Sequence, residues 1–348
     1  MEKQGKRDGN EKRSLRKEWV AAVFALLMAT ALPALTAYLF GLEGNRGVDA
    51  LSEETSVVIF RHGEEAAEEM TLERALILSL AATNPSDTPA ASLEAQAVVL
   101  RSRAVWWMGY CNGDTEQGSG EAGNGRTESP QTEGLQTEDL RRTLCDSPAH
   151  GLPYRSESEL TAILGAEETT ARIAAAEQAA ASTRGQVLCF EGEVIPAMIH
   201  TSSAGATRTV EELSWLCSVT TPEEAVVAVC RVDAEDARAA LAARFGLLLS
   251  ADPTEWEISV TTDSGITESV RVGGETLAAT VIADALSLPS GNFVIEAAED
   301  ALVITCMGEG SGCGLSRAGA DVYARGGLSW GEILAHYYPD CTLGRAWE

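Results

Sequence analysis

The sequence predicts an α+β fold, a single domain in which helices and β-hairpins are mixed. Apolar residues recur at the helical period over 72–83 and 93–106, and pairs of alternating runs flank short turns, as they do in β-hairpins. The chain has 348 residues, of which 45% are hydrophobic, so it can bury a sizeable core. We place the domain at residues 56–343.

The N-terminal region has the charge pattern of a membrane anchor. Residues 1–18 carry seven basic and four acidic side chains, whereas residues 19–40 carry none. An uncharged run of this length spans a bilayer core of about 30 Å as a helix, and a basic flank stays in the cytoplasm. We therefore predict a cytoplasmic tail at 1–18, a single-pass anchor in the cell membrane at 19–40, a tether at 41–55 and an extracytoplasmic domain. The alternative is a cleaved signal peptide, which the length of the run disfavours.

The rest of the chain is strongly acidic. The formal net charge is −26, although the first 18 residues are basic. An acidic body repels the phosphates of nucleic acids, so we predict no nucleic-acid partner. Any ligand has to be held by local polar and aromatic groups.

Two helices joined by a polar turn form the most informative stretch. The first, 72–83, must end before Pro85, because proline cannot continue a helix and biases the preceding residue towards extended geometry. Ser92 is a suitable cap for the second helix, 93–106. The turn between them can present one side chain to a substrate, and we expect that side chain to be Thr83.

The other elements are predicted from the same kinds of signal. Residues 56–60 are β-prone, and 64–70 form an acidic approach to the first helix. The stretch 112–137 has almost no apolar residues and is expected to be a disordered insertion. The remaining predictions are a helical segment over 157–183 interrupted at Gly165, a hairpin of strands 187–190 and 194–199, a helix opening at Thr221-Pro222-Glu223, a helix over 233–245 closed by Gly246, a hairpin of strands 256–262 and 266–272, a helix over 276–288 and a strand over 301–306.

The first helix pair also carries a resemblance to a known family. It is similar to the opening signature of the stage II sporulation protein D (SpoIID/LytB) family, in which Ala-Ala-Glu-Met-Pro is followed, after a turn, by a helix containing Gln-Ala-Val. The matching positions are Leu72, Glu73, Ala81, Ala82, Pro85, Leu93, Ala95, Gln96, Ala97, Val98, Arg101 and Ala104. The family's glutamate does not match, because Thr83 occupies its position and Asn84 replaces the methionine.

Three later blocks resemble the same family in the same order. The second block matches at Thr183, Gly185, Val187, Leu188, Gly192, Ile195, Ala197, His200, Ser202, Ser203, Gly205 and Thr207. The third matches at Leu286, Leu288, Ser290 and Phe293. The last is a glycine run with its following helices, matching at Gly308, Gly310, Gly312, Gly314, Ser316, Gly319, Ala320, Ile333, Leu334, His336, Tyr337, Tyr338 and Pro339. Ser311 and Arg317 stand where the family has His and Gln.

The resemblance implies a SpoIID-like domain and a peptidoglycan lytic transglycosylase activity. In that reaction the glutamate protonates the glycosidic oxygen and then takes a proton from the 6-hydroxyl of the sugar, which threonine cannot do. Thr83 therefore marks the catalytic position without its acid. The implied substrate-binding residues are Gln96, Arg101, His200, Ser202, Ser203, Gly205, Gly310, Ser311, Gly312, Ser316 and Arg317. A purely structural role is the alternative for His200.

Another carboxylate is the alternative source of an acid. Asp87 and Glu94 are close to Thr83 in sequence, whereas Glu73 is ten residues away. The simpler interpretation of Asp87 and Glu94 is that they are solvated surface groups.

Residues 139–154 resemble the family's zinc-binding segment, but only one of its ligands is retained, Cys145. Asp139 and Gly151 stand where the family has His and a second Cys. A site rebuilt from Asp139, Cys145 and His150 is the alternative to a metal-free loop, and we expect no zinc and no other cofactor. The chain has eight cysteines; an extracytoplasmic location permits disulfides, but their spacing favours free buried thiols.

These observations lead to one hypothesis and two alternatives. We predict a membrane-anchored sporulation protein of engulfment that acts on peptidoglycan, binding glycan strands or supporting a cell-wall amidase, with weak or no cleavage of its own. The first alternative is an active lytic transglycosylase that uses a relocated carboxylate, and the second is a structural anchor without glycan contact. The expected partners are glycan strands, a cell-wall amidase, other engulfment membrane proteins and the membrane itself.

Overall fold

The computed structural model describes residues 51–61, 67–110, 143–146, 152–224, 226–246, 249–262 and 265–347. The predicted tail, the anchor at 19–40, residues 41–50 of the tether and the insertion at 112–137 lie outside these residues. Within the described ranges, no helix combines the length and the apolar character needed to cross a membrane. Residues Ser52–Glu348 form one compact unit.

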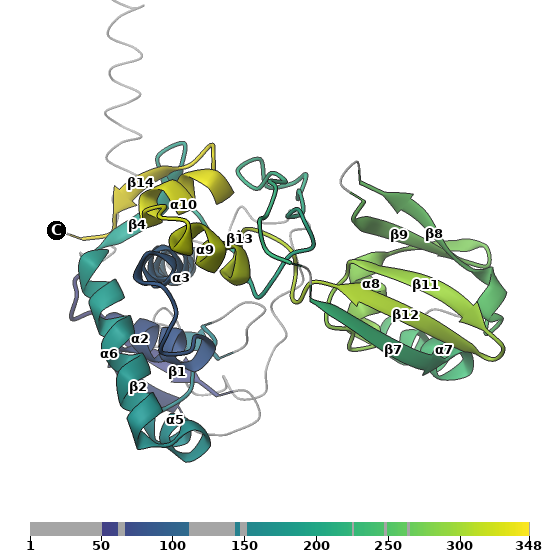
Figure 1. Ribbon diagram of the computed structural model, residues 1–348, viewed down its shortest axis with the longest axis horizontal. Helices are drawn as coiled ribbons and strands as arrows, with labels where there is room; N and C mark the ends of the chain where they lie inside the picture. The colour runs from purple at the N-terminus through teal and green to yellow at the C-terminus, as the bar shows by residue number, and fades with distance from the viewer. Residues whose placement is uncertain are drawn as a thin grey trace, which may run out of the picture. The chain divides into compact units, whose positions relative to one another are not determined.

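This unit mixes helices and small sheets, so the predicted α+β class is confirmed (Figure 1). The described helices are α2 (Leu72–Thr83), α3 (Ala90–Tyr110), α5 (Glu157–Leu164), α6 (Ala166–Ser182), α7 (Ala234–Phe245), the 3₁₀ turn η2 (Pro253–Glu255), α8 (Ala279–Ala285), α9 (Arg317–Arg325) and α10 (Trp330–Tyr337). The described strands are β1 (Ser56–Phe60), β2 (Ala67–Thr71), β3 (Thr143–Cys145), β4 (Gln186–Phe190), β5 (Glu193–Val194), β6 (Ile199–His200), β7 (Val227–Asp233), β8 (Trp256–Thr261), β9 (Thr267–Val272), β10 (Glu275–Ala278), β11 (Phe293–Ala298), β12 (Ala301–Met307), β13 (Leu315–Ser316) and β14 (Thr342–Arg345).

Helix α2 ends where the sequence predicted, whereas helix α3 begins earlier than predicted. Helix α2 stops at Thr83, as the following Asn84 and Pro85 require. Helix α3, in contrast, begins at Ala90, so Ser92 lies inside its first turn and is not its cap. The carbonyl of Pro89 accepts the backbone N–H groups of Ser92 and the residue after it, which starts the helix early. The Ser92 hydroxyl is thereby released for a side-chain hydrogen bond.

The small sheet of β1, β2 and β3, which contacts α2, contains a strand that the sequence did not predict. Strand β1 pairs antiparallel with β2 and parallel with β3. Residues 67–71, which we expected to be part of an acidic approach, form β2, and the residues from 64 to 66 lie outside the description. Strand β2 was not predicted because it contains two consecutive glutamates, Glu68 and Glu69, and because β propensity depends strongly on the partner strand.

The hairpin predicted at 187–199 is shorter than expected. Strand β4 pairs with the two-residue strand β5 around Glu191 and Gly192, both of which have positive φ angles of 52° and 91°. After β5 the chain leaves this sheet at Pro196, which has no N–H group to donate, and β6 pairs in parallel with β13 instead. Residues next to His200 therefore lie against the end of the glycine run.

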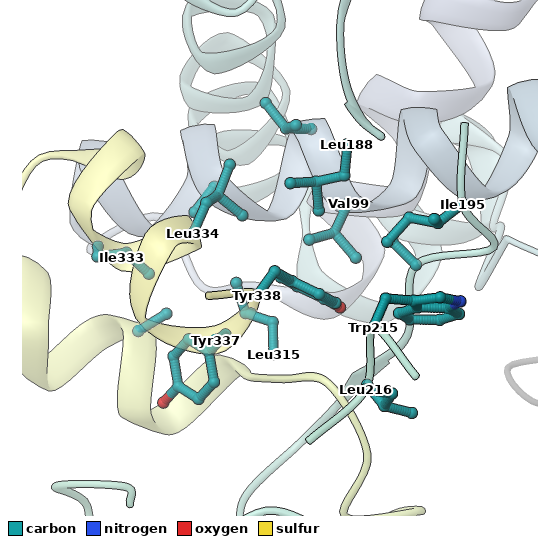
Figure 2. Packing of buried hydrophobic residues seen from close by; sticks show 14 of the residues in the cluster. Val99, Leu188, Ile195, Trp215, Leu216, Leu315, Ile333, Leu334, Tyr337 and Tyr338 are labelled. Carbon is teal, nitrogen blue, oxygen red and sulfur yellow. The ribbon is translucent and has the colours of Figure 1, made fainter. Parts of the chain in front are cut away.

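A large apolar cluster joins α3, β4, β13 and α10. Figure 2 shows Val99, Leu188, Leu315 and Leu334 from these four elements packed together. The indole of Trp215 stacks on the ring of Tyr338 with centroids 6.4 Å apart. Burial of this cluster joins the first and last of the four family-like sequence blocks in one core.

A second cluster lies on the sheet of order β11-β12-β7, one face of which is covered by α7 and α8 (Figure 1). Helix α7 has the predicted boundaries: Asp233 caps it, accepting from two backbone N–H groups, and Gly246 closes it in the left-handed conformation. The hairpin of β8 and β9 is also confirmed.

Two predicted helices of this region are wrong. The stretch 276–288 is divided between β10 and the shorter helix α8, because its first residues pair with β9. No helix opens at Thr221 among the described residues, which instead continue extended towards β7. The reason is that Glu223 points into the interior, where two groups from distant segments bind it.

Candidate functional site

The site begins at the C-terminal end of α2, where Thr83 occupies the position of the expected acid. The Thr83 hydroxyl donates to the backbone carbonyl of Ser79 at 2.9 Å, one turn back in the same helix. It also accepts from Nδ2 of Asn84 at 3.1 Å. Both sides of the hydroxyl are thus used within the protein, and among the described residues no carboxylate hydrogen-bonds to Thr83.

A chain of side-chain hydrogen bonds leads from Thr83 into α3. Asn84 Nδ2 donates to Gln96 Oε1 at 3.0 Å, and Gln96 Nε2 donates to the Ser92 hydroxyl at 3.1 Å. Gln96, Asn84 and Ser92 are all buried, so these bonds fix the orientation of each amide. Gln96, an expected substrate-binding residue, is therefore held as a support for the Thr83 position.

Arg101 lies elsewhere and is fully occupied by protein acceptors. Its guanidinium forms two bonds to the Glu73 carboxylate, at 2.7 and 3.0 Å, and donates to the backbone carbonyls of Thr183 and Gln186 at 2.9 and 3.1 Å. Arg101 has no exposed surface, so this arrangement joins α2, α3 and the start of β4. The pairing also removes Glu73 from the carboxylates that could serve as an acid.

The second half of the site is built around His200. Its Nε2 atom lies 2.6 Å from the Ser203 hydroxyl, and its Nδ1 atom lies 3.0 Å from the Cys313 carbonyl. Burial lowers the pKa of His200 to about 4, against the opposing effects of the Cys313 carbonyl and the Glu223 charge. The imidazole is therefore neutral at pH 7, and it connects the turn after β6 to the glycine run.

Glu223 completes this half from a third segment of the chain. Its Oε1 atom accepts the backbone N–H of Ser203 at 2.8 Å and the hydroxyl of Ser316 at 2.6 Å. Ser316 also caps α9 by accepting from the N–H of Gly319. A buried carboxylate thus locks the 200–203 turn onto the start of α9.

The glycine run approaches this turn too closely to tolerate side chains. The backbone N–H groups of Thr201 and Ser202 donate to the Glu309 carbonyl, and a Cβ atom at Gly310 would lie 3.0 Å from the Cβ atom of His200. A small pocket, with room for about one water molecule, lies beside the run. It is lined by Ser202, Ser203, Ala204, Ala206, Arg208, Ile266, Ser290, Asn292, Met307 and Gly312.

The remaining expected substrate-binding residues differ in exposure. Gly205, Gly310 and Ser311 are exposed at the turns of this half. Arg317 is half-buried and donates to the Thr201 hydroxyl at 2.6 Å. The structure thus brings the residues from 200 to 205 and from 310 to 317 together, whereas Arg101 belongs to a separate internal network.

The sequence analysis missed three residues that shape the site. Glu223 was expected in a helix cap, and Arg208, whose Nη2 atom donates to the carbonyls of Thr267 and Gly291 at 2.8 Å each, was not considered. Asp321 was also missed; burial is the largest cause of its raised pKa, and it interacts with Ser92. No local sequence signal could have found them, because each acts on a segment far away in the chain.

The predicted weak metal site receives no support from the described residues. Cys145 ends β3 and forms no disulfide with a described residue, while Asp139 and His150 lie outside the description. In the described ranges, no group of three or more metal-ligating side chains is found. The seven cysteines of these ranges form no disulfide with one another.

Comparison with known proteins supports one family across most of the chain. A family model described as stage II sporulation protein (SpoIID) matches residues 61–190. The stage II sporulation protein D of Bacillus subtilis (strain 168) is 23% identical over 308 residues, which cover 87% of this chain and 83% of the relative. The stage II sporulation protein D of Bacillus amyloliquefaciens is 24% identical over 296 residues, covering 84% of this chain and 79% of the relative.

Proposed function

Because the chain belongs to the SpoIID family of sporulation proteins, we propose that it binds peptidoglycan glycan strands during sporulation and cleaves them weakly or not at all. The proposal includes the single-pass membrane anchor at 19–40 and an extracytoplasmic site. It requires no zinc or other cofactor.

The observation that carries the proposal is the hydrogen bonding of the Thr83 hydroxyl. Its hydroxyl is bound to the Ser79 carbonyl and to Asn84, and a threonine hydroxyl has no pKa near neutral pH that would let it act as a general acid. Loss of a general acid costs roughly a hundred- to ten-thousand-fold in rate. The framework around it, by contrast, is kept by hydrogen bonds through Asn84 and Gln96.

The exposed polar surface near the glycine run supports glycan binding. Gly310 and Ser311 are exposed beside the pocket that Ser202, Ser203 and Arg208 line. Backbone and hydroxyl groups are suitable partners for sugar hydroxyls, and they carry no charge that would have to be desolvated.

The test measures binding and cleavage separately on peptidoglycan stripped of its stem peptides. The full-length protein, purified in a mild detergent, should sediment with the insoluble glycan, and Ser311→Trp should weaken this binding about tenfold or more by occluding the site, a loss of about 1.4 kcal/mol. Ser259→Trp is the matched control, because Ser259 is exposed on β8 and outside the proposed site. Failure of the unmodified protein to bind glycan would refute the proposal.

A Thr83→Glu variant tests the loss of the acid. It should form 1,6-anhydro sugar ends about a hundredfold faster than the unmodified protein, because a carboxyl group returns to a preserved framework. Mass spectrometry of the released fragments gives this rate. Equal rates for the two proteins would contradict the proposal that the unmodified protein cleaves weakly because it lacks a carboxyl group at position 83.

A second candidate function, support of a cell-wall amidase, is favoured by an exposed apolar row across the sheet of β11, β12 and β7. Val229 and Val294 are both register partners of Thr305 and are 66% and 41% exposed, and Val227 on the edge strand β7 is 60% exposed. Exposed apolar patches of this kind mark protein interfaces. We propose that the amidase docks here.

The docking proposal is tested with an amidase assay in the presence of the full-length protein. Val229→Asp should reduce stimulation of the amidase while leaving glycan binding unchanged. Val260→Asp is the control, since Val260 is 47% exposed on β8, outside this row. Unchanged stimulation by Val229→Asp would argue against docking on this sheet.

A further inference from the structure

Strand β7 is an edge strand whose outer side is unpaired within the described part of the chain. The sheet order is β11-β12-β7, so β7 pairs with β12 on one side and with no described strand on the other (Figure 1). It has seven residues and contains no proline, which natural proteins use to block such edges. An open edge of this kind presents backbone N–H and C=O groups that an incoming strand can bind.

The hydrogen bonds that flank β7 show which of its residues direct these groups outwards. The N–H of Gly308 donates to the carbonyl of Val226, just before β7, and the N–H of Ala234, just after β7, donates to the carbonyl of Asp300. Hydrogen-bonded pairs alternate along an antiparallel ladder. The even-numbered residues of β7 therefore bond to β12, and the odd-numbered residues direct their backbone groups away from it.

The pairing of β12 with its other neighbour agrees with this alternation. The N–H of Met307, the last residue of β12, donates to the carbonyl of Asn292, just before β11. Odd-numbered residues of β12 thus bond to β11, which leaves the even-numbered ones for the even-numbered residues of β7. Val227, Val229 and Arg231 therefore face outwards with their backbone groups, and no described backbone group outside the sheet bonds to them.

The side chains of these three residues lie on the open face of the sheet. Successive side chains of a strand point to opposite faces, and Ala228 and Val232 pack against the cluster that α7 and α8 cover. The side chains of Val227 and Val229 point the other way and are 60% and 66% exposed. A strand added to the outer side of β7 would contact these valines as well as bond to the backbone.

The charge of Arg231 indicates the chemistry of the added strand. Its side chain is 57% exposed, and its ion pair with Asp300 is long, 3.9 Å, to a side chain that is 84% exposed. Asp233, the other charged residue of β7, is occupied as the cap of α7. Residues that lie opposite each other on paired strands share a face, where opposite charges stabilise the pair. The complementary strand thus has a carboxylate opposite Arg231 and apolar residues opposite Val229 and Val227.

From this arrangement we propose that β7 accepts an extended segment of a partner protein as a fourth strand of the sheet. The segment runs antiparallel to β7, because antiparallel pairs are slightly more stable per residue. The proposal deepens the amidase docking described above and rests on it for the identity of the partner. It adds that main-chain hydrogen bonds supply the affinity, while the alternate side chains supply the selectivity.

The first test uses the full-length protein in mild detergent and a synthetic peptide, fluorescein-Thr-Glu-Thr-Val-Thr-Val-Thr-amide. In the antiparallel register its glutamate lies opposite Arg231, and its two valines lie opposite Val229 and Val227. A control peptide methylated on the backbone nitrogens of both valines keeps every side chain but cannot donate to the outward carbonyls. It should bind at least about tenfold more weakly in fluorescence anisotropy, a loss of about 1.4 kcal/mol. Equal binding of the two peptides, or binding of neither, would overturn the inference.

A proline in β7 makes the same test on the protein. Val229→Pro removes an outward N–H but no bond to β12, and edge strands tolerate proline. It should weaken peptide binding about fivefold or more, whereas Val229→Thr, which keeps the N–H and the β-branched shape, should stay within about twofold. Circular dichroism and unchanged glycan binding show that the variant is folded. Val227→Pro, which removes the neighbouring outward N–H, is the second variant if the first does not fold.

Amide hydrogen exchange distinguishes strand addition from side-chain contact alone. Bound peptide should slow exchange at the outward amides of Val227, Val229 and Arg231, and should leave the amides of Ala228 and Cys230, which already bond to β12, nearly unchanged. Absence of this alternation in the presence of saturating peptide would contradict the inference.

The amidase assay separates this inference from the proposed docking. If Val229→Pro stimulates the amidase as well as the unmodified protein does, strand addition is wrong, although docking on the sheet face stands. If the peptide binds as expected but the unmodified protein does not stimulate the amidase, the docking proposal is wrong, and the edge accepts a different partner of the same chemistry. Sedimentation of the protein alone as a dimer that Val229→Pro abolishes would overturn the inference, because a second copy would then occupy the edge.

Discussion

The Nε2 atom of His200 lies 2.6 Å from the Oγ atom of Ser203, three residues further along the chain. The other ring nitrogen, Nδ1, faces the Cys313 carbonyl, which can only accept, so Nδ1 carries the proton and Nε2 accepts from the serine. The pair therefore requires a neutral imidazole. It holds the turn after β6 against the glycine run, which is how two blocks of sequence more than a hundred residues apart form one surface.

This neutral histidine should make stability depend on pH. Burial lowers the pKa of His200 to about 4, whereas an unfolded chain has a histidine pKa of about 6.5, so the unfolded state binds the proton more readily. The contribution to stability is fully present above pH 6.5 and is lost as the pH falls towards 4, amounting to at most about 3 kcal/mol. Urea unfolding at several pH values measures it.

Two variants of this cluster identify the cause. His200→Gln should be less stable at pH 7 but should lack this part of the pH dependence. Ser203→Ala should keep the dependence, since burial rather than the serine is the largest cause of the lowered pKa. If the unfolding free energy of His200→Gln still falls between pH 6.5 and pH 4 as it does in the unmodified protein, other groups cause the pH dependence.

Gly319 should not tolerate even one methyl group. A Cβ atom there would lie 2.1 Å from the Tyr337 hydroxyl and 2.7 Å from Glu223 Oε2, so Gly319→Ala should lower the free energy of unfolding by about 1–3 kcal/mol. Gly331 in α10 is the control, because a Cβ atom there would have no neighbour within 4 Å. Gly331→Ala should stabilise the protein by about 0.5–1 kcal/mol, the ordinary helix effect. Equal effects at the two sites would contradict the packing around α9.

The buried pair of Arg101 and Glu73 should be far more sensitive than an exposed pair. Arg101→Met leaves the Glu73 carboxylate, only 12% exposed, without its partner, and should cost about 3–5 kcal/mol in unfolding free energy. Arg244→Met is the matched control, since Arg244 and Asp284 are 54% and 55% exposed, and its cost should stay below about 1 kcal/mol. A small effect at Arg101 would show that the guanidinium is not the internal connector described above.

The Cys341 thiol should react slowly with alkylating reagents. Burial is the main cause that raises its pKa to about 12, and the charge of Asp340 and the nearby Cys189 and Cys217 raise it further. At pH 8 the reactive thiolate is thus roughly a thousandfold scarcer than for a thiol of ordinary pKa, about 8.5. Iodoacetamide labelling followed by mass spectrometry should show a rate that keeps rising between pH 7 and pH 10, and Asp340→Asn should label faster. Rapid labelling at pH 7 would contradict the raised pKa.

Local signals predicted those elements whose ends depend on neighbouring residues. Helix α7 begins at the cap of Asp233 and ends at Gly246, and α2 ends before Pro85, as the sequence indicated. The α+β class followed from the same kinds of pattern, whereas the family was indicated by the resemblance of four sequence blocks. Capping, proline geometry and turn glycines act within a few residues, so one sequence window contains the whole cause.

Elements and contacts that depend on distant segments were decided only by the tertiary structure. Glu223 has the signals of a helix start, but the Ser203 N–H and the Ser316 hydroxyl bind its carboxylate in the interior, and no helix forms there. Ser92 has the signals of a cap, but it lies within α3 and its hydroxyl accepts from Gln96 Nε2 instead. The sequence by itself thus predicted the family resemblance, the class of fold and the threonine at position 83 where the family has a glutamate. Which carboxylates are bound inside the protein, as Glu73 and Glu223 are, depended on burial and on partners tens of residues away, which no local pattern contains.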